Sequence, residues 1–214
     1  MRKRLKGKVA LISGAARGIG AETARKMAAA GAAVVIGDVL LDRAHELAQE
    51  IGKAGGRGLA LSLDVTTEAS WTAAVVAATN AFGKLDILVN NAGMFLGKDV
   101  MEATMEDWHR LVAINMTGVW LGTKVCAPKL AESGKASLHG SAIVNLASVA
   151  GIVGSQLDPL YSMTKGGVTL FTKSTALAFG RKGWRIRVNS IQPSVIEGRA
   201  DFRIAGPPGG QQRC

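Results

Sequence analysis

The chain has 214 residues, of which 48% are hydrophobic, 20% charged and 5% aromatic, which excludes a disordered or fibrous protein. Its length fits one domain that buries roughly 70% of the surface of the unfolded chain. The net charge is +10, but five of the basic residues lie within residues 1–8 and few aromatic residues accompany them. We therefore expect a basic N-terminal arm rather than a nucleic-acid interface.

Cysteine usage and hydropathy indicate the compartment. Cys126 and Cys214 lie far apart and form no pair or cluster typical of a disulfide scaffold or a zinc site. The apolar run that follows the basic start, residues 9–12, is too short for an export signal. Residues 27–41 are interrupted by two glycines and an aspartate, so they fall short of the ~20 apolar residues of a membrane span. We expect a soluble cytoplasmic protein with no membrane partner and no bound metal.

Six short runs rich in β-branched residues are predicted to be strands, and Ala-rich segments long enough for crossover helices separate them. The runs are nearly continuous in hydrophobicity, which is typical of parallel strands covered on both faces. Right-handed crossovers then give an α/β fold with a doubly wound parallel sheet of the Rossmann type, whose ligands bind beyond the carboxyl ends of the strands. The predicted strands are residues 9–13, 33–37, 59–63, 87–90, 142–146 and 186–191.

The chain is predicted to form a single dinucleotide-binding catalytic domain over residues 8–196, after the basic arm of residues 1–7. No repeat or linker divides residues 8–192. From residue 197 onward the apolar periodicity disappears and Gly, Pro, Gln and Arg dominate, so residues 197–214 are predicted to be an irregular tail.

A glycine-rich turn follows the first predicted strand and precedes a helical segment. Gly14, Gly18 and Gly20 let the backbone approach a pyrophosphate, and the N-terminus of the helix offers free N–H groups. The alternative is a tight turn without a ligand, but the position at the first strand-to-helix connection favours a phosphate loop. The expected cofactor contacts of this turn come from Gly14, Arg17, Gly18, Ile19 and Gly20.

The G-x-x-x-G-x-G spacing of this turn and four further motifs resemble the short-chain dehydrogenase/reductase family. The resemblance covers residues 6 to 196 and implies an oxidoreductase that uses a nicotinamide cofactor. The further motifs appear in the family's order, with Ser148 thirteen residues before the tyrosine, and they are Asn90-Asn91-Ala92-Gly93, Asn115, Ser148 and Tyr161-Ser-Met-Thr-Lys165.

Tyr161 and Lys165 are four residues apart, so a helix places them on one face. A nearby ammonium favours the phenolate and is expected to lower the pKa of Tyr161 from the usual ~10, so that Tyr161 acts as acid in ketone reduction and as base in alcohol oxidation. The resemblance implies that Ser148 binds the substrate oxygen, that Lys165 also holds the nicotinamide ribose and that Asn115 holds a water. Taken singly, each of these residues also has an ordinary structural role.

Asp38 ends the second predicted strand, eighteen residues after Gly20. A carboxylate there accepts the adenosine ribose hydroxyls and repels a 2′-phosphate, which favours NAD over NADP. Arg17 argues for NADP, since a guanidinium pairs with phosphate, and a capping role is the structural alternative for Asp38. We give Asp38 the greater weight. The resemblance implies further cofactor contacts from Asp64, Val65, Asn90 and Ile196.

The sequences of residues 142–148 and 185–191 resemble those of secondary-alcohol and hydroxysteroid dehydrogenases. An apolar pocket would suit an alicyclic or steroid-like substrate. Two alternatives stay open, a 3-oxoacyl-thioester reductase, whose usual NADP preference disagrees with Asp38, and a non-catalytic nucleotide-binding protein. The pocket is expected to be lined by Met94, Phe95, Ile152, Val153 and Leu157.

The C-terminal part departs from the family pattern. Ser194 stands where the family usually has Gly, and Gly198 where it usually has Thr. After about Glu197 the chain looks truncated or read in another frame, so we expect the sheet to lack the family's last strand and to expose an apolar edge. The helices within residues 105–129 and 161–179 carry more apolar residues than one sheet face needs, which predicts association with a second copy. The resemblance implies pairing through these helices, and the family's tetramer contact uses a final strand and helix that we expect to be missing, so of a homodimer and a homotetramer we expect the homodimer.

Overall fold

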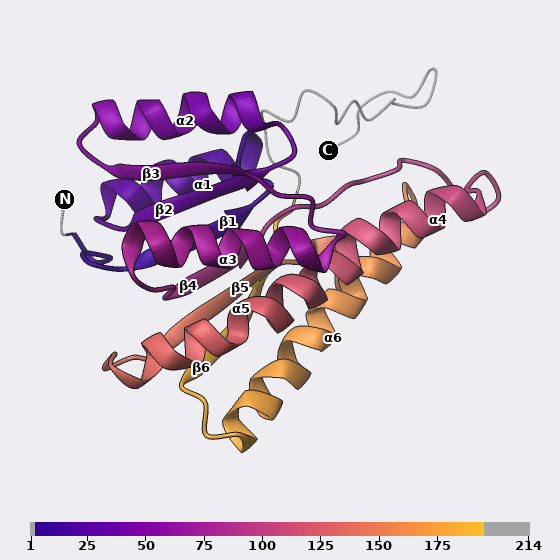
Figure 1. Cartoon of the computed structure of the whole chain (residues 1–214). Helices are drawn as coiled ribbons and strands as arrows, with labels where there is room; N and C mark the ends of the chain where they lie inside the picture. Colours follow the sequence, from indigo (N-terminus) through magenta and orange to yellow (C-terminus); the bar gives the residue numbers. More distant parts are fainter. Residues whose placement is uncertain (1–2, 195–214) are drawn as a thin grey trace, which may run out of the picture.

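A computed structural model describes residues 3–194 of the chain (Figure 1). All six strands of its sheet are parallel, in the order β3-β2-β1-β4-β5-β6, which confirms the predicted doubly wound Rossmann-type sheet. The strands are β1 (Val9–Ser13), β2 (Ala33–Asp38), β3 (Arg57–Ser62), β4 (Ile87–Asn90), β5 (Ser141–Leu146) and β6 (Ile186–Ile191).

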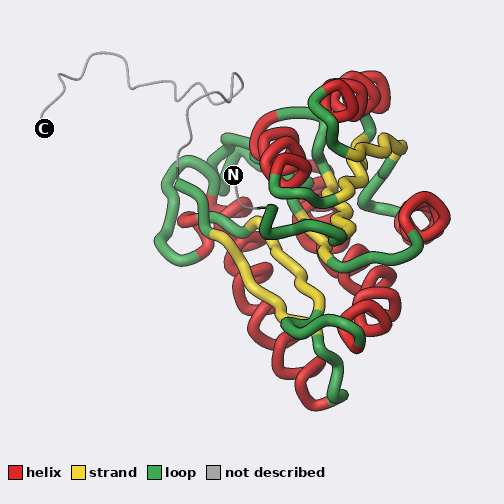
Figure 2. The backbone as a smooth tube through the Cα atoms, turned by 90° about the vertical axis from the view of Figure 1, so that its left-hand side faces the viewer, coloured by secondary structure: helices red, strands yellow, loops and turns green. Residues whose placement is uncertain are grey.

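Helices cover both faces of the sheet (Figure 2). On one face lie α1 (Gly18–Ala29) and α2 (Leu41–Lys53). On the other face lie α3 (Glu68–Phe82), α5 (Gly118–Lys135) and α6 (Pro159–Arg181). The short helix α4 (Met105–Val112) continues through a π-helical turn, η1 (Ala113–Thr117), into α5, and a 3₁₀ turn, η2 (Val149–Gly151), precedes α6.

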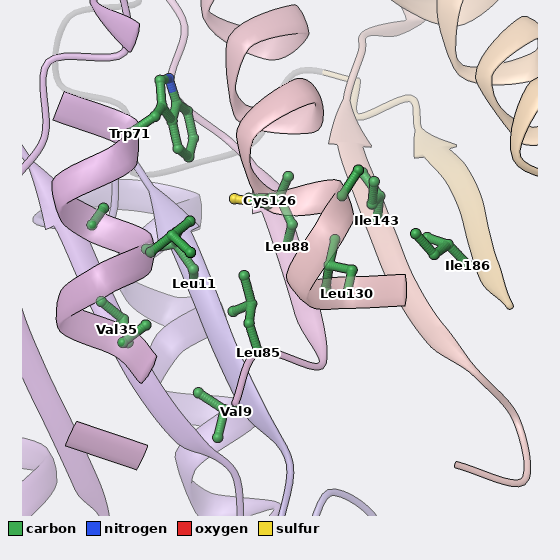
Figure 3. Packing of buried hydrophobic residues seen from close by; sticks show 14 of the residues in the cluster. Val9, Leu11, Val35, Trp71, Leu85, Leu88, Cys126, Leu130, Ile143 and Ile186 are labelled. Carbon is green, nitrogen blue, oxygen red and sulfur yellow. The ribbon is translucent and has the colours of Figure 1, made fainter. Parts of the chain in front are cut away.

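The central strands β1 and β2 are buried along their whole length, as their continuous hydrophobicity predicts. Because strand side chains alternate between faces, Ile12 packs with α1 and α2, whereas Leu11 packs with Trp71 and Leu130 from α3 and α5 (Figure 3). Cys126 lies fully buried in that second layer, and burial raises the pKa of its thiol.

Of the two edge strands, β6 has the predicted bounds, whereas β3 does not. The run at residues 59–63 was expected to form the third strand, but β3 begins at Arg57, which pairs with Ala33, and ends at Ser62. Leu63 leaves the strand and packs under Gly37 instead. β6 is buried on one face only, with Ile186 and Val188 inside, because no helix of residues 3–194 packs on its other face.

The basic N-terminal arm packs against the helices α1 and α2. Leu5 of the basic arm is half-buried against the α1 and α2 layer, and its N–H donates to the carbonyl of Ala30 at 2.9 Å. Ile196 and the predicted tail lie outside the described residues. Between residues 3 and 194, every helix is too short or too polar to traverse a lipid bilayer.

Candidate active site

The site lies at the carboxyl edge of the sheet, where β1 and β4 run side by side and the chain leaves them in opposite directions. Asn91 follows β4 and reaches across to the glycine-rich turn that follows β1. Its Nδ2 donates to the carbonyl oxygens of Ser13 at 2.9 Å and Gly14 at 2.8 Å. The Oγ of Ser13 in turn accepts from the N–H groups of Asn91 and Ala92. These bonds fix the two connections to each other.

The glycine-rich turn is too crowded for side chains at two positions. A Cβ on Gly20 would overlap the carbonyl oxygen of Gly14 and come within 2.5 Å of Nδ2 of Asn91. A Cβ on Gly14 would lie 2.7 Å from the Cα of Ala92. The turn therefore closes tightly against the connection after β4, and its backbone forms the surface on which a ligand would rest.

Helix α1 begins without a side-chain cap at Arg17 and has no acidic residue in its first turn. Helices α2 and α3 also begin without a side-chain cap, whereas Thr104 and Asp107 form a capping box on α4 and Asp158 caps α6. The uncapped N–H groups and the positive end of the α1 dipole point toward the mouth of the turn. This N-terminus fits the pyrophosphate of a dinucleotide.

Asp38 is the last residue of β2 and is 7% exposed. One carboxylate oxygen accepts from the N–H of Ala16 at 2.9 Å and the other from the N–H of Leu40 at 3.0 Å. Asp38 therefore holds the glycine-rich turn, in line with the capping role that was the alternative to cofactor binding. Since a carboxylate offers about four acceptor positions, it also retains room for two ribose hydroxyls.

Asp64 and Val65, which were predicted to contact the cofactor, follow β3. Asp64 is exposed, and its Oδ1 accepts from the N–H and the hydroxyl of Thr66. Val65 is buried, and its carbonyl accepts from Nε1 of Trp71 at 3.1 Å. Both follow the carboxyl end of β3, beside the end of β2 that carries Asp38.

The Asn90 side chain lies in the interior rather than at the mouth of the turn. It is 2% exposed, and its Nδ2 donates to Asn145 on β5 at 2.9 Å. Its Oδ1 has no hydrogen-bond partner among the described residues and faces Gly122 of α5. Asn90 links β4 to β5 and α5, and its place beside an adenosine ribose stays a prediction.

Asn115 lies fully buried in the π-helical turn between α4 and α5. Its Oδ1 accepts from the N–H of Met94 at 2.8 Å, and its Nδ2 donates to the Met94 carbonyl at 2.9 Å and to Oγ1 of Thr164 at 3.1 Å. The wide turn, which the sequence did not predict, aims this amide at the segment after β4 and at α6.

Lys165 and Tyr161 lie on one face of α6, as their spacing predicts. Nζ of Lys165 is 5.6 Å from the centre of the Tyr161 ring and donates to the carbonyl of Leu146 at the end of β5. A Cβ on Gly93 would lie 3.3 Å from Oδ1 of Asn115 and 3.4 Å from Nζ of Lys165. The amide and the ammonium therefore converge on the backbone of Gly93.

Ser148 follows β5 and is 8% exposed. Its Oγ accepts from the N–H of Ala150 at 3.1 Å, which begins the η2 turn. A Cβ on Gly151 would lie 2.6 Å from the carbonyl carbon of Lys165, so this turn rests directly on α6. The close contact holds the Ser148 connection against the helix that carries Tyr161 and Lys165.

One aromatic ring contacts Tyr161, and three aliphatic residues lie in the segment between η2 and α6. The Phe95 ring meets the Tyr161 ring edge-on, with 5.2 Å between ring centres and an angle of 79° between the planes. Ile152, Val153 and Leu157 are 67%, 62% and 41% exposed. A ring contact to Tyr161 and exposed aliphatic side chains in the segment that leads to it suit a substrate with an apolar ring and one oxygen.

The loop between β4 and α4 ends in a rigid corner. Lys98 pairs with Asp107 at 2.7 Å, and Thr104 donates to the same carboxylate. The Lys98 ammonium, followed by the amide and hydroxyl of Thr104, lowers the pKa of Asp107 to about 2.

Asp158 and Thr164 contact the site, although the sequence reasoning missed both. Asp158 is 0% exposed and binds backbone amides of two different segments. Aspartate directly before proline at the start of a helix is an N-cap signal, so its local role could have been predicted. Its contacts with the distant loop after β4 left no signal in the local sequence.

Comparison with known proteins gives a consistent result. Residues 8–204 match the sequence profile described as short chain dehydrogenase. The chain is 44% identical over 200 residues to a trans-4-hydroxycyclohexanecarboxylate dehydrogenase of Sinomonas cyclohexanicum, which covers 91% of this chain and 74% of that protein. It is 43% identical over 197 residues to a 3-alpha-(or 20-beta)-hydroxysteroid dehydrogenase of Mycobacterium tuberculosis, covering 92% of this chain and 72% of that protein. A cyclopentanol dehydrogenase of Comamonas testosteroni is 37% identical over 193 residues, covering 90% of this chain and 74% of that protein.

Proposed function

Because this chain belongs to the short-chain dehydrogenase family, we propose that it transfers a hydride between NAD(H) and a cyclic secondary alcohol or ketone. The observation that carries the proposal is the convergence of Asn115 and Lys165 on Gly93, with Tyr161 on the same helix face as Lys165 and the Phe95 ring against Tyr161. The enzyme class follows from the family, whereas the cofactor NAD and the cyclic substrate are proposed.

The nicotinamide ring, when bound, accepts or supplies the hydride. The backbone of Gly14 and Gly20 and the uncapped end of α1 would hold the pyrophosphate, and Asp38 the adenosine ribose. Lys165 extends from α6 toward the connections after β4 and β5, where it would hold the second ribose. The residues proposed for the pyrophosphate and the adenosine ribose thus come from β1, β2 and their connections, and Lys165, proposed for the second ribose, comes from α6.

Tyr161 handles the proton. In alcohol oxidation, the hydroxyl proton of the substrate passes to Oη of Tyr161 while the hydride leaves the carbinol carbon, and reduction reverses both transfers. The Lys165 ammonium favours the ionised phenol, and the Ser148 hydroxyl would orient the substrate oxygen. Asn115 fixes the Met94 backbone and lies beside Lys165, where a water can continue the proton path.

The relatives act, by their names, on a cyclohexane carboxylate, steroids and cyclopentanol. The exposed aliphatic side chains near Tyr161 support a substrate of the same kind, and the thioester-reductase alternative is not favoured. Turnover of NAD with cyclohexanol, cyclopentanol and a hydroxysteroid, compared with a 3-hydroxyacyl thioester, tests the proposal. Faster turnover of the thioester than of every cyclic alcohol would reject the substrate class.

Asp38→Ser is expected to relax the preference for NADH over NADPH. The wild-type carboxylate, 7% exposed, repels a 2′-phosphate that comes close to it, and a hydroxyl removes this repulsion. We expect the ratio of the two dissociation constants to fall about tenfold or more, which corresponds to ~1.4 kcal/mol. Fluorescence titration with both cofactors measures the ratio, and Asp42→Ser on the exposed start of α2 is the matched control. Tighter binding of NADPH than of NADH by the wild-type chain would overturn the assignment.

We further propose a cytoplasmic homodimer that pairs through α5 and α6. Met163, Leu170 and Leu177 are spaced seven residues apart on α6 and are 53%, 65% and 77% exposed, and Trp120 on α5 is 49% exposed. A row of this kind on one helix face is typical of a surface that a second copy covers. The cytoplasmic location is supported by Cys126, a buried thiol without a disulfide partner.

Leu170→Glu is expected to convert the dimer into a monomer, because a buried carboxylate in an apolar interface is not paired. Light scattering at micromolar concentration measures the mass. Leu138→Glu changes an equally apolar residue that is 82% exposed and lies in the turn between α5 and β5, outside both helices, so it should leave the mass unchanged. A monodisperse monomer in the wild-type protein would contradict the proposed dimer.

A further inference from the structure

The carboxylate of Asp158 joins two segments of the active site. The side chain is 0% exposed and directly precedes α6. Its Oδ1 accepts from the N–H of Tyr161 at 2.9 Å, whereas its Oδ2 accepts from the N–H groups of Leu96 at 2.8 Å and Gly97 at 3.1 Å. Leu96 and Gly97 belong to the loop between β4 and α4, so one side chain binds two elements that are distant in sequence.

Helix capping accounts for only one of these oxygens. A serine, threonine or asparagine caps a helix about as well as an aspartate. Only an ionised carboxylate offers two oxygens that accept in every direction without presenting a donor. The second oxygen accepts from two loop amides, those of half-buried Leu96 and exposed Gly97, and losing that acceptor would leave them without this bond.

The loop that Asp158 holds carries Phe95, one of the residues predicted to line the substrate pocket. Asn115 binds the loop at Met94 through two hydrogen bonds, and Asp158 binds it at Leu96 and Gly97. Phe95 lies between these two attachments and places its ring edge-on against the Tyr161 ring. The same carboxylate thus fixes the backbone of Tyr161 and the backbone next to Phe95.

We propose that Asp158 is a positioning residue that sets the Phe95 ring against Tyr161 and thereby controls which ring-shaped substrates reach the phenol. The inference rests on the proposed proton-transfer role of Tyr161. Asp158 acts through the loop and touches neither substrate nor cofactor. Release of the loop moves Phe95 away from Tyr161, which lowers the rate with the preferred cyclic alcohol without weakening cofactor binding.

Tyr161 is the only tyrosine of the chain, which gives a probe that needs no turnover. In protein labelled with ¹³C-tyrosine, all ring signals come from Tyr161, and the edge-on Phe95 ring shifts them. Phe95→Leu defines the signal position without that ring. Asp158→Ser keeps one capping oxygen and loses the acceptor of the loop amides, so we expect its Tyr161 signals to move toward the Phe95→Leu position.

Asp99→Ser is the matched control. Asp99 also accepts from two backbone amides of this loop, those of Met101 at 2.7 Å and Glu102 at 3.1 Å, but it is exposed. Its variant should leave the Tyr161 signals in place. Asp158→Asn, which keeps the volume of the side chain, provides a second test and should move the signals in the same direction as Asp158→Ser.

The kinetic measurement is a double-variant cycle with Phe95→Leu. Asp158→Ser is expected to lower kcat/KM for the preferred cyclic alcohol about 10- to 100-fold, with an unchanged dissociation constant for NADH. In the Phe95→Leu background the further loss should be much smaller, because the two residues act through one contact. Two results together would overturn the inference and leave Asp158 as a helix cap. The Tyr161 signals would stay in place, and the loss of kcat/KM in the double variant would equal the product of the losses in the two single variants.

Failure of the proposed function gives a different pattern. If Tyr161→Phe retained full turnover, the proton-transfer role would be wrong, while the ring signals would still show whether Asp158 positions Phe95. If Tyr161→Phe were inactive and the Asp158 variants behaved like Asp99→Ser, the function would stand and the inference would fail.

Discussion

Tyr161→Phe is expected to abolish turnover while cofactor binding persists. The change removes only the phenolic hydroxyl. The edge-on contact with Phe95 and the hydrogen bond from the backbone N–H of residue 161 to Asp158 therefore remain. Loss of a positioned general acid or base costs about 10²- to 10⁴-fold in rate. The absorbance change of the nicotinamide cofactor measures turnover, and a fluorescence titration with NADH measures binding.

Ser162→Ala provides the control for this experiment, since it removes a hydroxyl from the next residue of the same helix. That hydroxyl donates to the carbonyl of Asp158 at 3.2 Å, a bond within the first turn of the helix that the backbone N–H of Ser162 also makes. We expect nearly wild-type turnover from this variant. Near wild-type rates in purified Tyr161→Phe protein would refute the acid–base role.

Gly20→Ala is expected to remove cofactor binding without unfolding the protein. The new methyl group would overlap the Gly14 carbonyl and lie 2.9 Å from the Cα of Ala15, so the backbone of the turn has to shift. Overpacking of this kind costs about 1–3 kcal/mol. Since the shifted atoms are those that would face the pyrophosphate, we expect the dissociation constant for NADH to rise at least about tenfold.

The matched control is Gly52→Ala in α2. A Cβ at Gly52 meets no atom within 4 Å, and alanine favours a helix by roughly 1 kcal/mol over glycine. Its melting temperature should therefore stay or rise, with unchanged NADH binding. If Gly20→Ala bound NADH as tightly as the wild type does, the glycine-rich turn would not be the phosphate loop.

The sequence predicted the sheet well, because continuous apolar runs such as those of β1 and β2 are characteristic of buried parallel strands. It was less accurate at β3, where pairing with β2 begins two residues before the apolar run. Strand ends depend on the neighbouring strand, which a local pattern does not contain.

The candidate site was predictable where spacing carries geometry. Tyr161 and Lys165 share a helix face because they are four residues apart, and Ser148 lies near them because it follows an adjacent strand. The interior position of the Asn90 side chain and the two-segment contacts of Asp158 depend on partners far away in the chain. No window of sequence around either residue contains those partners.

The strand order reverses between β1 and β4, and this point separates two segments of the chain that have different proposed roles. The residues proposed to select the nucleotide come from the segment that ends with Val65, and those proposed to react come from Asn115 onward. The two segments are joined at the turn by the Asn91 side chain, which donates to the backbone carbonyls of Ser13 and Gly14, and by the Ser13 hydroxyl, which accepts from the N–H groups of Asn91 and Ala92, so relatives that share Ser13 and Asn91 keep these bonds. Recombination between relatives within α3 would therefore exchange cofactor preference and leave substrate preference with its original segment, so the two traits can evolve independently.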